Sequence, residues 1–189
     1  MAVDWAMNIT RQQLIAACQR YGPLVRVPAA IDGTRLLWGL SGNESSFGQN
    51  CAPRHEAGYC PISSGRYSGM VHSLTNQWGC LAHMSFGCWQ VMLVNCIGFS
   101  PLELLHDVDA QAQAVVGFLN RRIFDEQHAS TLAEVGDAYN HGNFRDLVSR
   151  AEGLGISEGV LLTRPDEMAK IFAGGYMARL AKNYTVPMQ

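Results

Sequence analysis

Residues 32–48, DGTRLLWGLSGNESSFG, predict a helix that ends beside a glutamate. Asp32 is a residue type that caps helix N-termini well, and the three leucines that follow it recur at the spacing of one helix face. Gly42 weakens the end of this helix because glycine has a poor helix propensity. Glu44 is therefore expected on the last helical turn or just beyond it.

Helical spacing extends over most of the remaining chain. Thr10 with Gln13 fits a capping box, and Pro101 stands at a favoured first helical position. Residues 86–96, FGCWQVMLVNC, are apolar almost all round, so we expect them to form a buried central helix. The other expected helices cover residues 10–21, 100–105, 107–123, 131–141, 144–155 and 165–180.

Residues 48–84 differ from the helical segments. Gly, Pro, Ser, His, Tyr and Cys dominate there and periodicity is lost, which predicts a structured loop or a small β excursion. The whole pattern favours a mainly α fold of the α+β type, in which a helical bundle surrounds the central helix and a loop-rich lobe is inserted at 48–84. A chain of 189 residues suits one domain, with residues 146–189 as a helical extension packed on it.

Composition and charge exclude several classes of partner. The chain is 48% hydrophobic and 16% charged, with a net charge of −2, which is typical of a globular protein. No basic run is longer than Arg121-Arg122, so we expect no nucleic-acid surface. The apolar stretches are too short to span a bilayer, and Asp4 interrupts the pattern of a secretory signal. We expect a monomer that needs no cofactor.

Five of the six cysteines gather in the middle of the chain, at Cys51, Cys60, Cys80, Cys88 and Cys96. Cys51 and Cys60 are the favoured disulfide pair if the protein works in an oxidising compartment. Structural zinc is an alternative because His55 and His83 lie close to these cysteines in sequence, although the spacing matches no common zinc module. Free buried thiols that act as small apolar residues are the third possibility.

Three short segments follow one another in the chain: GNESSFG at 42–48, SFGCWQVM at 85–92 and DAYNHG at 137–142. In order and spacing they resemble the lytic transglycosylases and goose-type lysozymes. In that superfamily a helix ends in Glu-Ser, a Gly-x-x-Gln-Val/Ile-Met helix follows, and an Ala-Tyr-Asn-x-Gly helix comes later. The resemblance covers residues 30–145 and implies a lysozyme-like fold that cleaves peptidoglycan. The long insertion before Gln90 departs from the family pattern.

The resemblance makes Glu44 the catalytic acid. The negative end of the helix dipole disfavours a carboxylate at a helix C-terminus, and neutral or apolar neighbours add desolvation in the same direction. Both effects raise the pKa toward the range that a general acid needs. Cleavage of a glycosidic bond requires such an acid to protonate the leaving oxygen. The alternative is a glutamate solvated at a frayed helix end.

The other two segments supply the expected sugar contacts. Gln90 must find hydrogen-bond partners within its apolar run, and the resemblance implies that it and the backbone around Met92 meet an N-acetyl group; a structural amide is the alternative. Tyr139 is expected to orient Glu44 or to help hold its proton, the alternative being a core aromatic with a hydrated hydroxyl. Asn140 is expected to bind sugar or to fix a turn.

Glu56 offers a second carboxylate within the insertion. An acidic residue at a similar spacing helps to position the attacking water in goose-type lysozymes, and a gap of about 6.5–9.5 Å between two carboxyl groups suits inversion by water. If Glu56 points away, the transglycosylase route is favoured, in which Glu44 protonates the leaving oxygen and then takes the C6 hydroxyl proton. A loop ion pair with Arg54 is the structural alternative. Ser46 and Tyr59 are further candidates for substrate binding.

The function that these residues predict is muramidase cleavage of the β-1,4 bond between N-acetylmuramic acid and N-acetylglucosamine, with peptidoglycan glycan strands as the partner. Lytic transglycosylation, which gives 1,6-anhydro products, is the first alternative. A non-catalytic module that binds glycan or protein and a zinc-stabilised interaction domain at 51–88 are alternatives from other classes. The biological setting stays open. A chain without a recognisable secretory signal fits a phage endolysin, a virion-associated enzyme or an enzyme exported by another route.

Overall fold

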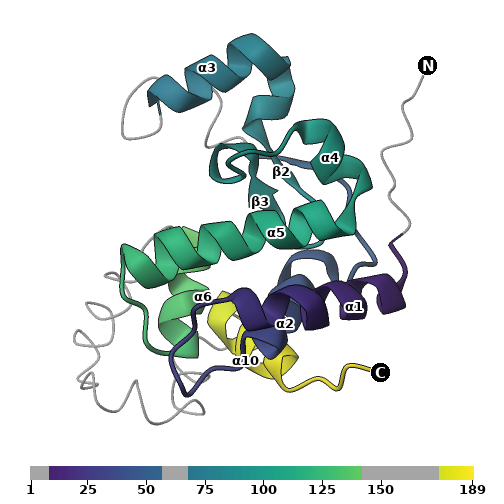
Figure 1. The fold of residues 1–189 in the computed structure, drawn as a ribbon, viewed down its shortest axis with the longest axis vertical. Coiled ribbons are helices and arrows are strands. Elements are labelled where there is room, and N and C mark those ends of the chain that lie inside the picture. The colour runs from purple at the N-terminus through teal and green to yellow at the C-terminus, as the bar shows by residue number, and fades with distance from the viewer. Residues whose placement is uncertain (1–8, 57–67, 142–174) are drawn as a thin grey trace.

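The computed structural model describes residues 9–56, 68–141 and 175–189, and it is mainly helical, as the sequence predicts. The helices are α1 (Arg11–Tyr21), α2 (Gly33–Ser45), α3 (Ser68–Trp78), α4 (Pro101–His106), α5 (Val108–Phe118), α6 (Leu132–His141) and α10 (Tyr176–Tyr184). A small antiparallel sheet has the order β1 (Arg54–His55), β2 (Met84–Phe86), β3 (Val91–Met92). In Figure 1 the sheet, α3 and α4 lie to one side of α5, and α1, α2, α6 and α10 lie to the other.

The predicted helix starts are confirmed where the sequence carries capping signals. Thr10 and Gln13 form a reciprocal capping box at α1, and Ser100 does the same with a glutamate at α4. Asp32 caps α2 by accepting the backbone N–H of Arg35 at 2.9 Å. This cap and the buried leucines behind it set the direction in which α2 runs toward Glu44.

The predicted central helix at residues 86–96 is wrong. Its first part belongs instead to a hairpin of β2 and β3, in which Ser85 pairs with Met92 and Phe86 with Val91, and residues Leu93–Asn95 form a short 3-10 helix. The physical reason is that a short run of apolar residues fits a buried strand pair as well as a buried helix, and periodicity cannot separate the two. Most of the residues are buried as expected, but in a strand pair and a short 3-10 helix.

The turn between β2 and β3 explains why the segment cannot be helical. Gly87 (φ 72°) and Gln90 (φ 47°) both adopt left-handed backbone. A Cβ at position 87 would lie 2.2 Å from the side chain of Gln111, whose Oε1 accepts the N–H of Cys88 at 2.9 Å. Glycine is therefore required at position 87 both for its backbone freedom and for space.

The loop-rich lobe expected at 48–84 holds more helix than the sequence predicts. Helix α3 forms from SGMVHSLTNQW, where Val71 is buried and the apolar residues are spaced by three and four among small and polar ones. Strand β1 supplies the small β element that was expected in this lobe. Residues 57–67 lie outside the described part of the chain.

The helix predicted at 107–123 changes its hydrogen bonding before it ends. Asp107 caps α5, but residues Leu119–Asp125 are π-helical. The N–H of Glu126 accordingly donates to the carbonyl of Arg121, five residues earlier, at 3.1 Å. Such π segments are rare and occur frequently at functional sites.

Helix α10 packs against α2. Gly39 permits the close approach, since a Cβ there would lie 3.0 Å from the backbone nitrogen of Tyr184. The Tyr184 hydroxyl in turn accepts the backbone N–H of Asp32 at 2.7 Å. Figure 1 shows α10 alongside α2 and below α6, so the C-terminal helix lies against the elements that carry two of the three motifs.

The C-terminal helix does not run through 165–180 as predicted. Gly175 stands at the N-cap in an extended conformation, and α10 begins at Tyr176. The earlier part of that prediction and the helix expected at 144–155 lie outside the described residues.

The hairpin is fixed to α2 through a buried tryptophan. The indole N–H of Trp89 donates to the carbonyl of Leu37 at 2.8 Å, and both side chains belong to the hydrophobic core. This bond holds the turn of the hairpin against the helix that carries Glu44.

Among the described residues, no helix combines the length and the apolar character that crossing a membrane requires.

Candidate functional site

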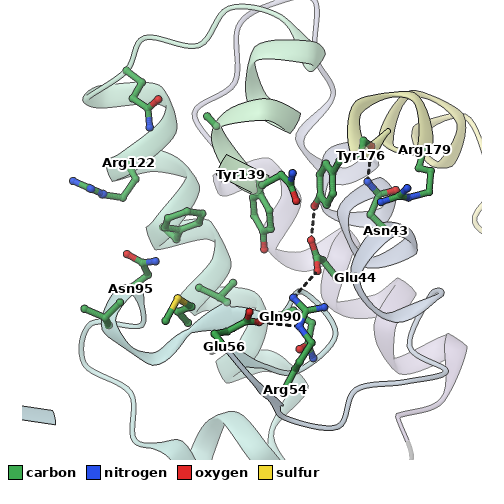
Figure 2. Close-up of a pocket in the computed structure, with 17 residues that line it drawn as sticks. Asn43, Glu44, Arg54, Glu56, Gln90, Asn95, Arg122, Tyr139, Tyr176 and Arg179 are labelled. Carbon is green, nitrogen blue, oxygen red and sulfur yellow. Dashed lines mark hydrogen bonds and ion pairs between the residues drawn. The ribbon is translucent and has the colours of Figure 1, made fainter. Parts of the chain in front are cut away.

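A pocket of about 330 Å³ lies where the end of α2, the sheet, the π-helical segment, α6 and α10 meet (Figure 2). Six of the residues predicted from the sequence line it: Glu44, Glu56, Gln90, Met92, Tyr139 and Asn140. Three arginines line it as well: Arg54, Arg122 and Arg179. The fold therefore brings the three sequence motifs to one place, although one of them is not helical.

Glu44 lies on the last turn of α2, as predicted, and only 9% of its side chain is exposed. The hydroxyl of Tyr176 donates to its Oε1 at 2.5 Å. Nη2 of Arg54 lies 3.7 Å from its Oε2, within ion-pair distance. Glu44 is thus a buried carboxyl group at a pocket wall and not a glutamate solvated at a frayed helix end.

Burial raises the pKa of Glu44 above its ordinary value, and desolvation is the largest cause. The hydrogen bond from Tyr176 lowers the pKa, and so do the charges of Arg54 and Arg179, whereas the charge of Glu56 raises it. The net direction is upward. Glu44 therefore keeps its proton to a higher pH than an exposed glutamate does.

Glu56 follows β1 and also lines the pocket. Its Oε1 accepts hydrogen bonds from Nε of Arg54 at 2.8 Å and from Oγ of Ser85 at 2.7 Å, and its backbone N–H donates to the carbonyl of His83. Glu56 thus combines two features that the sequence offered as alternatives. It faces the same pocket as Glu44, and it forms an ion pair with Arg54.

Arg54 lies between the two carboxylates, as Figure 2 shows. The register of the sheet, which pairs Arg54 with Ser85, places its side chain there. This arginine was not among the predicted site residues except as a partner of Glu56. Its charge lowers the pKa of Glu44, and it forms an ion pair with Glu56.

Tyr176 occupies the place that the sequence assigned to Tyr139, and this corrects the prediction. The hydroxyl of Tyr139 donates to the carbonyl of Trp89 at 2.6 Å and not to Glu44. Its ring instead lies nearly parallel to that of Tyr176, with centroids 6.3 Å apart and 15° between the planes. Tyr139 therefore supports the tyrosine that contacts Glu44.

The sequence placed Tyr176 only within the helix expected at 165–180. A signal for its role existed, because a buried tyrosine hydroxyl usually needs a hydrogen-bond partner. Burial, followed by the nearby charge of Glu44, raises the pKa of Tyr176 well above its usual value, so the phenol stays protonated and donates. Nδ2 of Asn43 donates to the Tyr176 carbonyl at 2.9 Å, and Asn183 donates to Asn43 at 2.8 Å, which fixes α10 to the end of α2.

Gln90 has a structural hydrogen-bond pattern. Its Oε1 lies 2.8 Å from Oγ of Ser85, whose single proton it shares with Glu56, and its Nε2 donates to the carbonyls of Gly87 at 2.8 Å and Ala52 at 3.1 Å. These bonds close the hairpin turn and join it to the chain before β1. Gln90 lines the pocket. Its amide hydrogen bonds are those of a structural amide, which was the alternative to a sugar contact.

The remaining predicted residues differ in where they lie. Met92 on β3 and Asn140 on α6 line the pocket. Ser46 is the exposed, left-handed cap of α2 (φ 52°) and does not line it. Tyr59 lies outside the described residues.

The cysteines of the described segments are free thiols. Cys18, Cys51, Cys88 and Cys96 are buried, and the thiol of Cys51 donates to the carbonyl of Gly48 at 3.4 Å. Cys51 is a free thiol, so the favoured disulfide at Cys51 is not formed; Cys60 itself lies outside the described residues. His83 contacts Thr75 Oγ1 at 3.2 Å, and in the segments that the structure describes no three side chains of metal-binding type converge.

The chain matches no family model, and it matches no curated protein and no solved structure significantly. What the site can do must therefore be argued from its own groups. Those groups are a buried carboxyl with a raised pKa, a second carboxylate in the same pocket and an arginine between them. Such a set can donate a proton to a leaving group, and its second carboxylate can accept one from water.

Proposed function

We propose that this protein is a peptidoglycan-cleaving glycosidase of lysozyme-like fold, with Glu44 as its general acid. The reaction is cleavage of the β-1,4 bond between N-acetylmuramic acid and N-acetylglucosamine. The observation that carries the proposal is the buried Glu44 carboxyl, whose pKa is raised in a pocket that also holds a second carboxylate. The three motifs that resemble lytic transglycosylases and goose-type lysozymes support the same substrate.

In the proposed first step, Glu44 protonates the glycosidic oxygen as the bond to the sugar breaks. Tyr176 donates to Oε1, so Oε2 is the oxygen from which the proton is transferred. The transition state carries oxocarbenium character on the sugar ring. The carboxylate that remains on Glu44 then lies close to that positive charge and stabilises it.

In the hydrolytic route, Glu56 orients the attacking water and takes its proton. Both hydrogen bonds to its side chain, from Arg54 and Ser85, fall on Oε1, so Oε2 is left to meet a water molecule. Glu56 is fixed by the sheet, which gives it one defined position relative to Glu44. An inverting mechanism with two carboxyl groups has these requirements.

Lytic transglycosylation is the second candidate, and one observation favours it. Arg54 holds Glu56 in an ion pair, which opposes its use as a base. In this route Glu44 takes the C6 hydroxyl proton after bond cleavage, the N-acetyl group assists, and the sugar closes to a 1,6-anhydro ring. No base other than Glu44 is then needed.

Mass spectrometry of peptidoglycan digested by the purified protein distinguishes the two routes. Hydrolysis leaves reducing ends, whereas transglycosylation leaves anhydro ends that are lighter by one water. We expect reducing ends. Products that are exclusively anhydro would overturn the hydrolytic route, and binding to cell walls without any released product would favour a non-catalytic glycan-binding module instead.

A further inference from the structure

Three buried cysteines gather in the core, away from the pocket that holds Glu44. They are Cys18 on α1, Cys51 in the segment after α2 and Cys88 in the hairpin turn, with exposed fractions of 0%, 5% and 0%. Gly48 touches two of them. The Cys51 thiol donates to the Gly48 carbonyl at 3.4 Å, and a Cβ added to Gly48 would lie 3.9 Å from Sγ of Cys88.

Cys51 and Cys88 act on each other directly. The side-chain interaction with Cys88 is the largest cause that lowers the pKa of the Cys51 thiol, and the interaction with Cys51 is the largest cause that raises the pKa of Cys88. The charge of Cys18 is a smaller influence on Cys88. Interactions of this kind fall off within a few ångströms, so Cys51 is the thiol that neighbours Cys88.

The surrounding backbone fixes the position of both cysteines. The turn that leaves α2 is closed by the N–H of Gly48, which donates to Oγ of Ser45 at 3.0 Å, and this turn returns the chain to the core at Cys51. The N–H of Cys88 donates to Oε1 of Gln111 at 2.9 Å. The two thiols are therefore neighbours in the folded protein before any bond joins them.

We propose that Cys51 and Cys88 form a disulfide when the chain folds in an oxidising compartment. This pairing differs from the Cys51–Cys60 bond that the sequence favours. The bond closes residues 52–87, which include β1, α3 and β2, so it joins the two ends of the inserted lobe at its base. It also ties the segment that follows Glu44 to the hairpin. The inference does not depend on the proposed function.

The chemical step is a thiol–disulfide exchange with an external organic disulfide, such as oxidised glutathione. One protein thiolate attacks the oxidant, releases one glutathione thiol and forms a mixed disulfide, from which the second protein thiolate displaces the other glutathione. The two cysteines together lose two electrons and two protons, and the oxidant is reduced to two thiols. Because both thiols are buried in the folded protein, the exchange takes place as the chain folds, and the completed bond is then shielded from thiols in solution.

Refolding of the fully reduced chain tests the pairing. The protein is refolded from urea in a mixture of reduced and oxidised glutathione, and in parallel in dithiothreitol, and free thiols are then blocked with iodoacetamide. Peptide mapping of the oxidised protein by mass spectrometry, without reductant, is expected to find the peptide of Cys51 linked to that of Cys88. Mapping is used in place of total mass because the exposed Cys80 can take up glutathione.

The Tm of the protein refolded in glutathione should exceed that of the protein refolded in dithiothreitol by roughly 5–15 °C, because the bond constrains a long loop of the unfolded chain. Cys51→Ala and Cys88→Ala are each expected to abolish this difference. Cys18→Ala and Cys96→Ala, which remove similarly buried thiols, should keep it. Comparison of one variant in two buffers cancels the cost of the cavity that each alanine leaves.

Three results would overturn the proposal. Recovery of Cys51 and Cys88 as free thiols after refolding in glutathione would show that they do not pair. A link from Cys88 to Cys18, or from Cys51 to Cys60, would assign the bond to another pair. A mapped Cys51–Cys88 bond that left the Tm unchanged would show that it does not fasten the lobe. Since no measurement here involves cleavage of cell walls, a failure of this pairing is distinguishable from a failure of the proposed function.

Discussion

The phenol of Tyr176 donates a 2.5 Å hydrogen bond to Oε1 of Glu44, and 132 positions of the chain separate the two residues. The bond joins the first turn of α10 to the last turn of α2. It also opposes desolvation, because it lowers the pKa of Glu44 while burial raises it. The proton affinity of the acid is therefore set by contacts between the two halves of the sequence.

Tyr176→Phe is expected to raise the pKa of Glu44 further, because the variant removes a hydrogen bond that stabilises the carboxylate. The alkaline limb of the activity profile, where the acid loses its proton, should then move to higher pH. The pH dependence of kcat/KM on purified peptidoglycan measures this shift. We also expect about a tenfold loss at the optimum, since the acid is less well oriented.

Tyr184→Phe is the matched control. It removes a hydroxyl from the same helix, at a tyrosine that contacts the backbone of Asp32 and not Glu44. The alkaline limb of this variant should coincide with that of the wild type. If Tyr176→Phe left the alkaline limb in place, or moved it to lower pH, the assigned role of the tyrosine would be wrong.

Glu56→Gln and Arg54→Gln are expected to move the alkaline limb in opposite directions. The Glu56 charge raises the pKa of Glu44, so its removal should lower that pKa and shift the limb to lower pH. The Arg54 charge lowers the pKa of Glu44, so its removal should shift the limb to higher pH. A carbon-detected NMR titration of the Glu44 carboxyl in each variant measures the two pKa changes without requiring activity.

The rate of Glu56→Gln also reports the route of the reaction. If Glu56 activates water, kcat should fall by about 10²- to 10⁴-fold, the usual contribution of a general base. If the sugar's own hydroxyl is the nucleophile, kcat should change little and the products should be anhydro sugars. A fully active Glu56→Gln enzyme that still released reducing ends would contradict the general-base role of Glu56 and also the transglycosylase route.

Glu44→Gln is expected to stabilise the protein at neutral pH. A carboxyl whose pKa is raised by folding binds its proton more tightly in the folded state. Its contribution to stability is therefore full below the ordinary value of 4.5 and is lost as the pH rises through the folded pKa. Above that window the wild type bears the cost of a buried charge, and glutamine does not.

Urea unfolding at two pH values measures the effect. At pH 7 the free energy of unfolding of Glu44→Gln should exceed that of the wild type by about 0.5–2 kcal/mol, the range of single stabilising substitutions. At about pH 4, below the window, the difference should largely disappear. A variant that was equally stabilised at both pH values would show that the charge of Glu44 is not the cause.

The α2 helix and its glutamate could be predicted because their signals are local. Asp32 marks the start, the leucines mark the buried face, and Gly42 comes just before the end. Caps and helix faces depend on residues three or four positions apart, so a single sequence carries them. The carboxyl of Glu44 was placed correctly for this reason.

The contacts that complete the site are not local, and for that reason the sequence did not predict them. Tyr139 and Tyr176 are both half-buried aromatic residues on helices, and only the packing of α10 decides which hydroxyl reaches Glu44. The hairpin at 84–92 was missed because a short apolar run suits a buried strand pair or a helix equally. Left-handed backbone at Gly87 and Gln90, which excludes the helix, depends on partners elsewhere in the fold.

Gly87→Ala tests the hairpin that replaces the predicted helix. The substitution strains a backbone at φ 72° and places a Cβ 2.2 Å from the side chain of Gln111, so we expect a loss of about 2–3 kcal/mol in stability. Gly79→Ala is the control, because Gly79 has a similar φ of 59° but no atom within 4 Å of the added Cβ, and should cost about 1 kcal/mol. Equal costs at the two positions would contradict the close packing of the turn on Gln111.

The most direct test of the central claim is the clearing of a suspension of purified cell walls by the wild-type protein and by Glu44→Gln, compared at equal concentration after circular dichroism has shown that both are folded. The account predicts that the wild type clears the suspension and that Glu44→Gln is slower by at least about 10³-fold, because the glycosidic oxygen then has no acid to protonate it. A folded Glu44→Gln protein that cleared cell walls at the wild-type rate would contradict the account.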